Sequence, residues 1–262
     1  MDVPSSTEKR TALVTGASFG IGAAIALELA RDGFDLAITA TLTENLKGTL
    51  SKLSTTGCRA TVLELNHRST DSIERTADEA VRELRRLDVL VNNAAVPFRK
   101  SAVEVTPKEW NDVMQVNAAG TFFLSQRIAK RWIDGKRPGC IINMASTYGV
   151  VGYSGVSVYG ISKAAVVHMT KMLAVEWAGY GIRVNAVAPG TVETDSRATT
   201  LADPQYRQSI LDKVPLHRFG TPEEIAAAVR YLASPAAAYV TGQLLLVDGG
   251  LSACGSRGTG AK

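Results

Sequence analysis

The sequence predicts a single-domain, doubly wound α/β fold in which a parallel seven-stranded sheet carries helices on both faces. The 262 residues, 45% of them hydrophobic, are enough for one large core. Short apolar runs rich in β-branched residues alternate with longer helical patterns, as in successive βαβ units. A glycine-rich stretch, TGASFGIG, follows the first apolar run.

Each strand is expected where a short apolar run stands between polar or glycine-containing turns. The expected strands cover residues 11–15, 34–40, 59–65, 87–93, 140–146, 182–188 and 243–249. Helices are expected where apolar residues recur at three- and four-residue spacing. They cover residues 21–33, 44–57, 72–86, 108–133, 159–178 and 222–232.

The domain is expected to span residues 10–251, between flexible tails at 1–9 and 252–262. The longest stretch without a periodic pattern, residues 189–214, is the expected position of a lid over the substrate, at about 190–214.

Composition argues against several classes of partner. The net charge is +4, but no basic run is interleaved with aromatic residues and no apolar run approaches a membrane span, so neither nucleic acid nor membrane is an expected partner. Cys58, Cys140 and Cys254 are scattered, and with three separated histidines they offer no spacing typical of metal ligands. A reducing compartment, the cytoplasm, is expected, with no metal.

The glycine-rich stretch stands where a strand turns into a helix. Gly16, Gly20 and Gly22 give the spacing GxxxGxG, which differs from the dinucleotide fingerprint GxGxxG. Glycine lets the backbone come close to a pyrophosphate, and the helix start offers N–H groups to phosphate oxygens. Taken alone, an ordinary glycine-rich turn explains the stretch equally well.

A second pattern lies in YGISK. Tyr159 and Lys163 are four residues apart, so on a helix they share one face and can act on the same substrate atom. Ser146 lies upstream, at the carboxyl end of a predicted strand, where open α/β sheets bind their ligands. These signals converge on one edge of the sheet.

With these motifs in this order, the sequence resembles the short-chain dehydrogenase/reductase superfamily, and especially its 3-oxoacyl-carrier-protein-reductase-like members. The resemblance covers nearly the whole chain. It is carried by TGASFGIG at 15–22, NNAA at 92–95, NAAG at 117–120, Ser146, YGISK at 159–163, PGTVET at 189–194 and TGQLLLVDGG at 241–250.

The resemblance implies a Rossmann-type sheet in the order 3-2-1-4-5-6-7 and hydride transfer between a nicotinamide cofactor and a carbonyl carbon. It makes Tyr159 the general acid or base and gives Lys163 two tasks, lowering the tyrosine pKa and binding the nicotinamide ribose. Ser146 would donate to the substrate oxygen, and Asn117 would hold a water that links Lys163 to solvent. The implied cofactor-binding residues are Gly16, Ser18, Phe19, Gly20, Ile21, Gly22, Thr41, Asn66, His67, Asn93, Ala94, Ala95, Tyr159, Lys163, Pro189, Gly190, Val192 and Thr194.

Departures from the family pattern bear on the cofactor. Ala40 and Thr41 stand after the second strand, where members that prefer NAD place an acid that would repel a 2′-phosphate. NADP(H) is therefore favoured over NAD(H), although Phe19 stands where NADP-using members often have a cation. Asn66 and His67 replace a common Asp and apolar residue beside the adenine, and Ala95 replaces a glycine.

The substrate is expected to be a small carbonyl compound or alcohol, because Thr147, Tyr148, Val151, Tyr153, Val192 and residues 193–213 give a lining with few fixed charges. That lining suits a neutral or weakly polar ketone. The favoured function is that of a general carbonyl reductase. A 3-oxoacyl-thioester reductase and a sugar or polyol dehydrogenase are alternatives, and a catalytically silent dinucleotide-binding regulator is disfavoured. Surplus apolar positions on the helices at 108–133 and 159–178 indicate a homodimer or homotetramer.

Overall fold

Seven parallel strands form one sheet in the part of the chain that the computed structural model describes, residues 9–194 and 202–254. Their order is β3-β2-β1-β4-β5-β6-β7, as predicted. The strands are β1 (Thr11–Val14), β2 (Asp35–Ala40), β3 (Ala60–Glu64), β4 (Val89–Asn92), β5 (Gly139–Met144), β6 (Ile182–Pro189) and β7 (Leu244–Val247). Residues 1–8 and 255–262 of the tails expected at 1–9 and 252–262, and residues 195–201 of the expected lid, lie outside the described residues.

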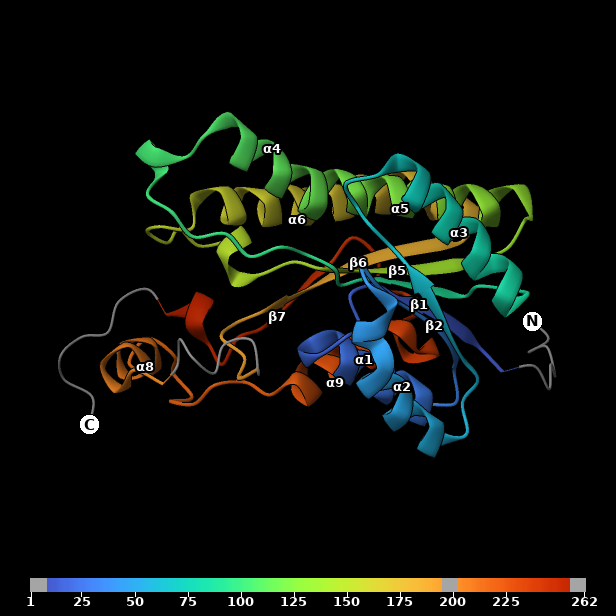
Figure 1. Ribbon diagram of the computed structural model, residues 1–262, viewed down its shortest axis with the longest axis horizontal. Coiled ribbons are helices and arrows are strands. Elements are labelled where there is room, and N and C mark those ends of the chain that lie inside the picture. Colours follow the sequence, from blue (N-terminus) through green and yellow to red (C-terminus); the bar gives the residue numbers. More distant parts are fainter. Residues whose placement is uncertain (1–8, 195–201, 255–262) are drawn as a thin grey trace.

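Helices cover both faces of the sheet (Figure 1). One layer consists of α1 (Gly20–Arg31), α2 (Lys47–Leu53) and α9 (Pro222–Ala233). The other consists of α3 (Thr70–Leu84), α4 (Pro107–Met114), α5 (Gly120–Asp134) and α6 (Ser157–Trp177). β1 and β4 are buried at every position, because a parallel strand between two helix layers has no solvent face. None of the helices in these described ranges is long and apolar enough to cross a membrane.

The helix predicted over residues 108–133 is divided. A π-helical turn at Gln115–Ala119 separates α4 from α5. Gly120 follows this turn directly, and a Cβ there would lie 2.6 Å from the His67 side chain. The chain therefore comes close to the loop after β3 at the point where its helical geometry changes.

The predicted lid contains a helix that the sequence analysis missed. Residues Pro204–Leu211 form α8, which Asp203 caps by accepting a hydrogen bond from the Gln205 N–H at 3.0 Å. An aspartate cap followed by proline at the first helical position is a known start signal. The signal was present in the sequence, but this short helix has too weak an apolar periodicity to be recognised.

Buried polar side chains connect the sheet to the helices that carry the site. The Asn92 amide donates to Ser125 Oγ on α5 and to Asn143 Oδ1 on β5, both at 2.8 Å. The Asn143 amide donates in turn to Thr170 Oγ1 on α6 at 2.9 Å. Because buried polar groups are costly unless paired, this chain of bonds specifies how α5 and α6 sit on the sheet.

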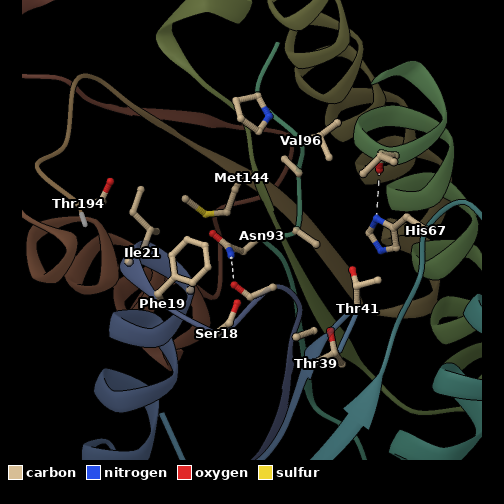
Figure 2. A pocket seen from close by; sticks show the side chains of 18 of the residues that line it. Ser18, Phe19, Ile21, Thr39, Thr41, His67, Asn93, Val96, Met144 and Thr194 are labelled. Atoms are coloured by element: carbon tan, nitrogen blue, oxygen red, sulfur yellow. Dashed lines mark hydrogen bonds between the residues drawn. The ribbon is translucent and has the colours of Figure 1, made fainter. Parts of the chain in front are cut away.

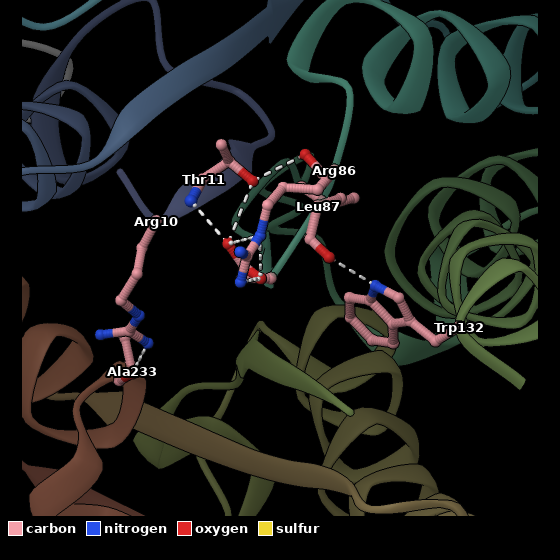
Figure 3. A network of polar contacts seen from close by, with 7 residues as sticks. Arg10, Thr11, Arg86, Leu87, Trp132 and Ala233 are labelled. Atoms are coloured by element: carbon pink, nitrogen blue, oxygen red, sulfur yellow. Dashed lines mark hydrogen bonds and ion pairs between the residues drawn. The ribbon is translucent and has the colours of Figure 1, made fainter. Parts of the chain in front are cut away.

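A separate polar network lies at the amino ends of the strands (Figure 3). Asp88, just before β4, accepts from the Thr11 backbone N–H at 2.9 Å and from the Arg86 guanidinium. The buried Trp132 indole donates to the Leu87 carbonyl at 2.6 Å. These contacts join the segments before β1 and β4 to α5 at the end of the sheet opposite the carboxyl ends of the strands.

Candidate active site

A pocket of about 510 Å³ opens at the carboxyl ends of the strands. Figure 2 shows the side chains of Phe19, Ile21 and Thr194 on one side of it and those of Thr41, His67 and Val96 on the other. Every residue predicted to bind the cofactor lines this pocket, as does Ser146. Asn117 does not line the pocket but contacts Val96, which does. The pocket starts at the end of β2 and reaches the amino end of α6.

The glycine-rich turn forms the floor of the pocket. Gly16 has a φ of +64°, in the left-handed region that favours glycine. A Cβ on Gly22 would lie 2.1 Å from the Gly16 carbonyl oxygen and 2.5 Å from the Asn93 amide nitrogen. No side chain fits there, so the first turn of α1 packs directly against the end of β1.

Hydrogen bonds hold this turn to the loop after β4. The Thr15 hydroxyl accepts from the backbone N–H groups of Asn93 and Ala94 at 2.9 and 3.0 Å. The Asn93 amide donates to the carbonyl oxygens of Thr15 and Gly16 at 3.0 and 2.9 Å. These four bonds bridge β1 and β4, between which the strand order reverses direction and open α/β sheets bind nucleotides.

The pocket fits a dinucleotide. Phe19 precedes α1 and gives it no side-chain cap, so the first N–H groups of the helix remain available for phosphate oxygens. At the other end, a Cβ on Gly190 would lie 2.7 Å from the Asp248 Cα, so the backbone after β6 is also kept bare. Glycine backbone from two different segments of the pocket lining leaves room for a ligand with phosphate groups.

Lys163 and Tyr159 share one face of α6. The Lys163 ammonium is buried and donates to the Met144 carbonyl at the end of β5, at 2.8 Å. Its Nζ lies 5.8 Å from the centre of the Tyr159 ring. Burial lowers the pKa of Lys163 to about 8, so the side chain is still mostly a cation at neutral pH.

Ser146 lies just beyond β5, with only 8% of its surface exposed. Its Oγ accepts from the Tyr148 backbone N–H at 3.2 Å, which leaves the hydroxyl proton free to point at a ligand. Tyr148 also packs edge-on against Tyr159, with ring centres 6.3 Å apart. The structure thus brings Ser146, Tyr159 and Lys163 to one end of the pocket.

Asn117 sits in the π-helical turn and acts on the backbone of a neighbouring loop. Its side chain accepts from the Val96 N–H at 2.8 Å and donates to the Val96 carbonyl at 3.0 Å. The side-chain amide also donates to Ser162 Oγ at 3.1 Å. The backbone carbonyl of Asn117 accepts from the Thr121 hydroxyl. These contacts link the loop after β4 to α6. The water-holding role expected from the resemblance stays a prediction.

His67, expected beside the adenine, is a buried group of the pocket wall. Its Nδ1 lies 3.1 Å from the Val116 carbonyl oxygen, as the dashed line in Figure 2 shows. Burial lowers its pKa to about 4, so the ring is neutral at physiological pH. A neutral ring whose Nδ1 donates to Val116 presents Nε2 as an acceptor.

The sequence analysis missed two polar residues at the adenosine end, Asn45 and Arg68. Arg68 directly follows Asn66 and His67, so its position in the chain was the available signal. Its guanidinium makes a bidentate contact with Asp112, with Nε and Nη2 at 2.6 and 2.8 Å from the two carboxylate oxygens. Among the described lining residues there is no carboxylate.

Comparisons with known proteins agree with this geometry. Residues 16–252 match the family model described as enoyl-(acyl carrier protein) reductase. The 2-dehydro-3-deoxy-D-gluconate 5-dehydrogenase of Escherichia coli is 38% identical over 94% of this chain and 96% of its own. The 3-oxoacyl-(acyl-carrier-protein) reductase of Thermotoga maritima is 38% identical over 93% of this chain and 98% of its own.

A solved structure shows the same architecture. A variant of actinorhodin polyketide ketoreductase, determined with NADPH, superposes with a TM-score of 0.89 at 36% identity, over 95% of this chain and 99% of that one.

The buried ammonium of Lys163 should cost stability. Below pH 8 it is charged in both the folded and the unfolded chain, so the full burial cost is present; between about pH 8 and 10.5 the folded chain loses the proton first and the cost shrinks. Lys163→Met should therefore raise the free energy of unfolding by about 2 kcal/mol at neutral pH, after roughly 1 kcal/mol is lost with the Met144 hydrogen bond.

The measurement is urea-induced unfolding of wild type and variant at neutral pH and near pH 10, where the gain should largely vanish. Lys171→Met, which removes an exposed lysine from the same helix, serves as the control. A destabilised Lys163→Met protein at neutral pH would contradict the expectation.

Proposed function

The chain belongs to the short-chain dehydrogenase/reductase family and is an NAD(P)-dependent oxidoreductase, and from this we propose that it interconverts a ketone and a secondary alcohol with Tyr159 as acid and base. One observation carries the proposal. Ser146, Tyr159 and Lys163 line the same pocket as the glycine turn that would hold the pyrophosphate. A nicotinamide cofactor bound there would supply or take up the hydride.

In the reduction direction, Ser146 donates a hydrogen bond to the carbonyl oxygen and Tyr159 gives it a proton; in oxidation, Tyr159 takes the proton from the alcohol. A tyrosine has an ordinary pKa near 10, so proton exchange at neutral pH requires stabilisation of the phenolate. A cation 5.8 Å from the ring centre contributes about 3 kcal/mol at an effective dielectric near 20.

Lys163 can supply this cation because its pKa of about 8 still lies above neutral pH. The Met144 carbonyl and the walls of the pocket hold the ammonium in place, so the phenolate is stabilised without reorganisation of the site. The positive charge of an oxidised nicotinamide would add to the same effect.

The first test removes the titrating hydroxyl. Tyr159→Phe should keep cofactor binding while lowering kcat by about a thousandfold, and Ser146→Ala should lower it by about a hundredfold. Steady-state kinetics on an accepted ketone and calorimetric binding of the cofactor provide the two readouts. Tyr180→Phe, which removes a hydroxyl from an exposed position after α6, is the matched control. Turnover close to wild type in Tyr159→Phe would rule out the assignment.

We further propose that NADP(H) is preferred over NAD(H). In support, the adenosine end is formed by Thr39, Ala40, Thr41, Asn45 and Arg68, without a carboxylate among the described lining residues. Arg68 places a guanidinium cation in the lining at this end of the pocket, where it also forms an ion pair with Asp112. An acid that repels a 2′-phosphate is thus missing where family members that prefer NAD place one.

The ratio of kcat/KM for NADPH to that for NADH should exceed one in the wild type. Ala40→Asp should lower the ratio at least tenfold, because its carboxylate repels the 2′-phosphate and accepts from the ribose hydroxyls. Ala40→Asn has nearly the same shape without the charge and should lower it much less. A wild-type ratio below one would refute the preference, and an unchanged ratio in Ala40→Asp would show that the ribose binds elsewhere.

We also propose a homodimer or homotetramer. Large apolar side chains remain exposed on the outer surfaces of α5 and α6, among them Phe123, Ile161, Met172 and Val175 at 42–83% exposure. A second group, Tyr231, Tyr239 and Leu246, lies on and near α9 and β7. The mass in solution, measured by light scattering at micromolar concentration, should exceed that of a monomer, and Val175→Glu should weaken the assembly. A monomeric wild type would contradict this.

The expected cytoplasmic location stays a prediction.

A further inference from the structure

A second pocket, of about 330 Å³, includes Tyr148 and Tyr153, two residues that the sequence analysis expected around the substrate. It is lined by Arg99, Tyr148, Gly152, Tyr153, Ser154, Thr191, Ser209, Ile210, Lys213 and Leu251. The sequence analysis expected a lining with few fixed charges here. The structure instead places two cations, Arg99 and Lys213, in one small pocket.

The same chain segments contribute residues to both pockets. Gly190 and Val192 line the first pocket, while Thr191 between them lines the second. In the same way, Pro97 lines the first and Arg99 the second. The second pocket therefore begins where the predicted reaction site ends.

Aromatic contacts lead from the reaction site to one of the cations. Ring centres lie 6.3 Å apart from Tyr159 to Tyr148 and 5.0 Å apart from Tyr148 to Tyr153. The Lys213 ammonium lies 5.0 Å from the centre of the Tyr153 ring. A substrate with a chain several bonds long could thus place its carbonyl at Tyr159 and its other end near Lys213.

Neither cation is neutralised within the described residues. Neighbouring cations do have carboxylate partners: Lys100 pairs with Glu109 at 2.9 Å, and Arg207 with Glu193 at 3.1 Å. No ion pair of Arg99 or Lys213 with a described carboxylate occurs, and the second pocket has no acid among its described lining residues. An anion bound in this pocket would be attracted by both cations, and no described lining residue carries a charge that would repel it.

Backbone contacts hold both segments in place. The Lys100 N–H, next to Arg99, donates to the Gly155 carbonyl at 2.9 Å, and the Lys213 N–H donates to the Ile210 carbonyl at 3.0 Å. The loop that carries Arg99 is also tied down at Val96 by Asn117. Arg99 and Lys213 therefore both stand on segments that backbone hydrogen bonds hold beside the second pocket.

Resting on the function proposed above, we propose that Arg99 and Lys213 bind an anionic group, a carboxylate or a phosphate, at the end of the substrate remote from the reacting carbonyl. Arg99 offers a planar fork of donors and Lys213 a point charge, and both suit an oxyanion. The natural substrate would then be an anionic ketone or alcohol, in place of the neutral one that the sequence suggested.

The test compares substrates that differ in the anion. In the carboxylate arm, 5-oxohexanoate is compared with its methyl ester. In the phosphate arm, acetoacetyl-CoA is compared with acetoacetyl-N-acetylcysteamine, a thioester without phosphates. The arm in which wild-type kcat/KM is about tenfold or more higher for the anionic member identifies the source of the anion.

Arg99→Gln and Lys213→Gln should each raise KM for the favoured anionic substrate about fivefold to tenfold, with kcat little changed, because a remote anion contributes binding in both ground and transition states. The same variants should change kcat/KM for the neutral partner by less than about twofold. Arg82→Gln removes an exposed cation from α3, far from both pockets, and should change neither. Added salt should weaken the wild-type preference.

Equal effects on charged and neutral substrates, or no anion preference in either arm, would overturn the inference while leaving the proposed reaction intact. If the wild type reduces none of the four substrates with either cofactor, binding decides the anion site. Calorimetric titration with D-gluconate and with CoA, in the presence of NADP⁺, should then show binding that Arg99→Gln/Lys213→Gln abolishes. Absence of binding to the wild type would refute the site.

Discussion

The close approach of the turn after β1 to the loop after β4 is the constraint on which the rest of the site depends. Gly22 packs so tightly on Gly16 and Asn93 that even a methyl group is excluded. Thr15 and Asn93 then join the two strands through four hydrogen bonds. Because helices leave β1 and β4 toward opposite faces, this junction is where a crevice must open, and it places bare backbone N–H groups along its floor.

The other end of the site depends on a charge that the fold holds out of water. Lys163 is buried against the Met144 carbonyl, and burial lowers its pKa to about 8. With this pKa the ammonium stays cationic at neutral pH, while its buried surroundings screen the charge poorly. The polar chain from Asn92 through Asn143 to Thr170 anchors α6, so stability lost at the lysine is offset by contacts that also fix its position.

The fold and the substrate are determined by different parts of the chain. The sheet and its first turn are features that the family shares, and the named relatives include enzymes for both a sugar acid and a carrier-bound thioester. The second pocket, beyond Tyr148, is lined by residues of loops and of α8. The specificity proposed for Arg99 and Lys213 therefore rests on these segments and not on the glycine turn.

The sequence by itself determined the seven strands and most of the helices, the glycine-rich turn between the first strand and helix, and the placing of Ser146, Tyr159 and Lys163 at one edge of the sheet. It could do so because these features depend on short-range spacing: apolar periodicity for the elements, and adjacency to a strand end for the side chains. The phosphate-binding role of the turn stays a prediction. Only the tertiary structure decided how deeply Lys163 is buried, that a π-helical turn interrupts the helix at 108–133, and that Arg68 pairs with Asp112. It also decided that Arg99 and Lys213 share a cavity, since they stand on loops far apart in the chain whose paths follow no periodicity.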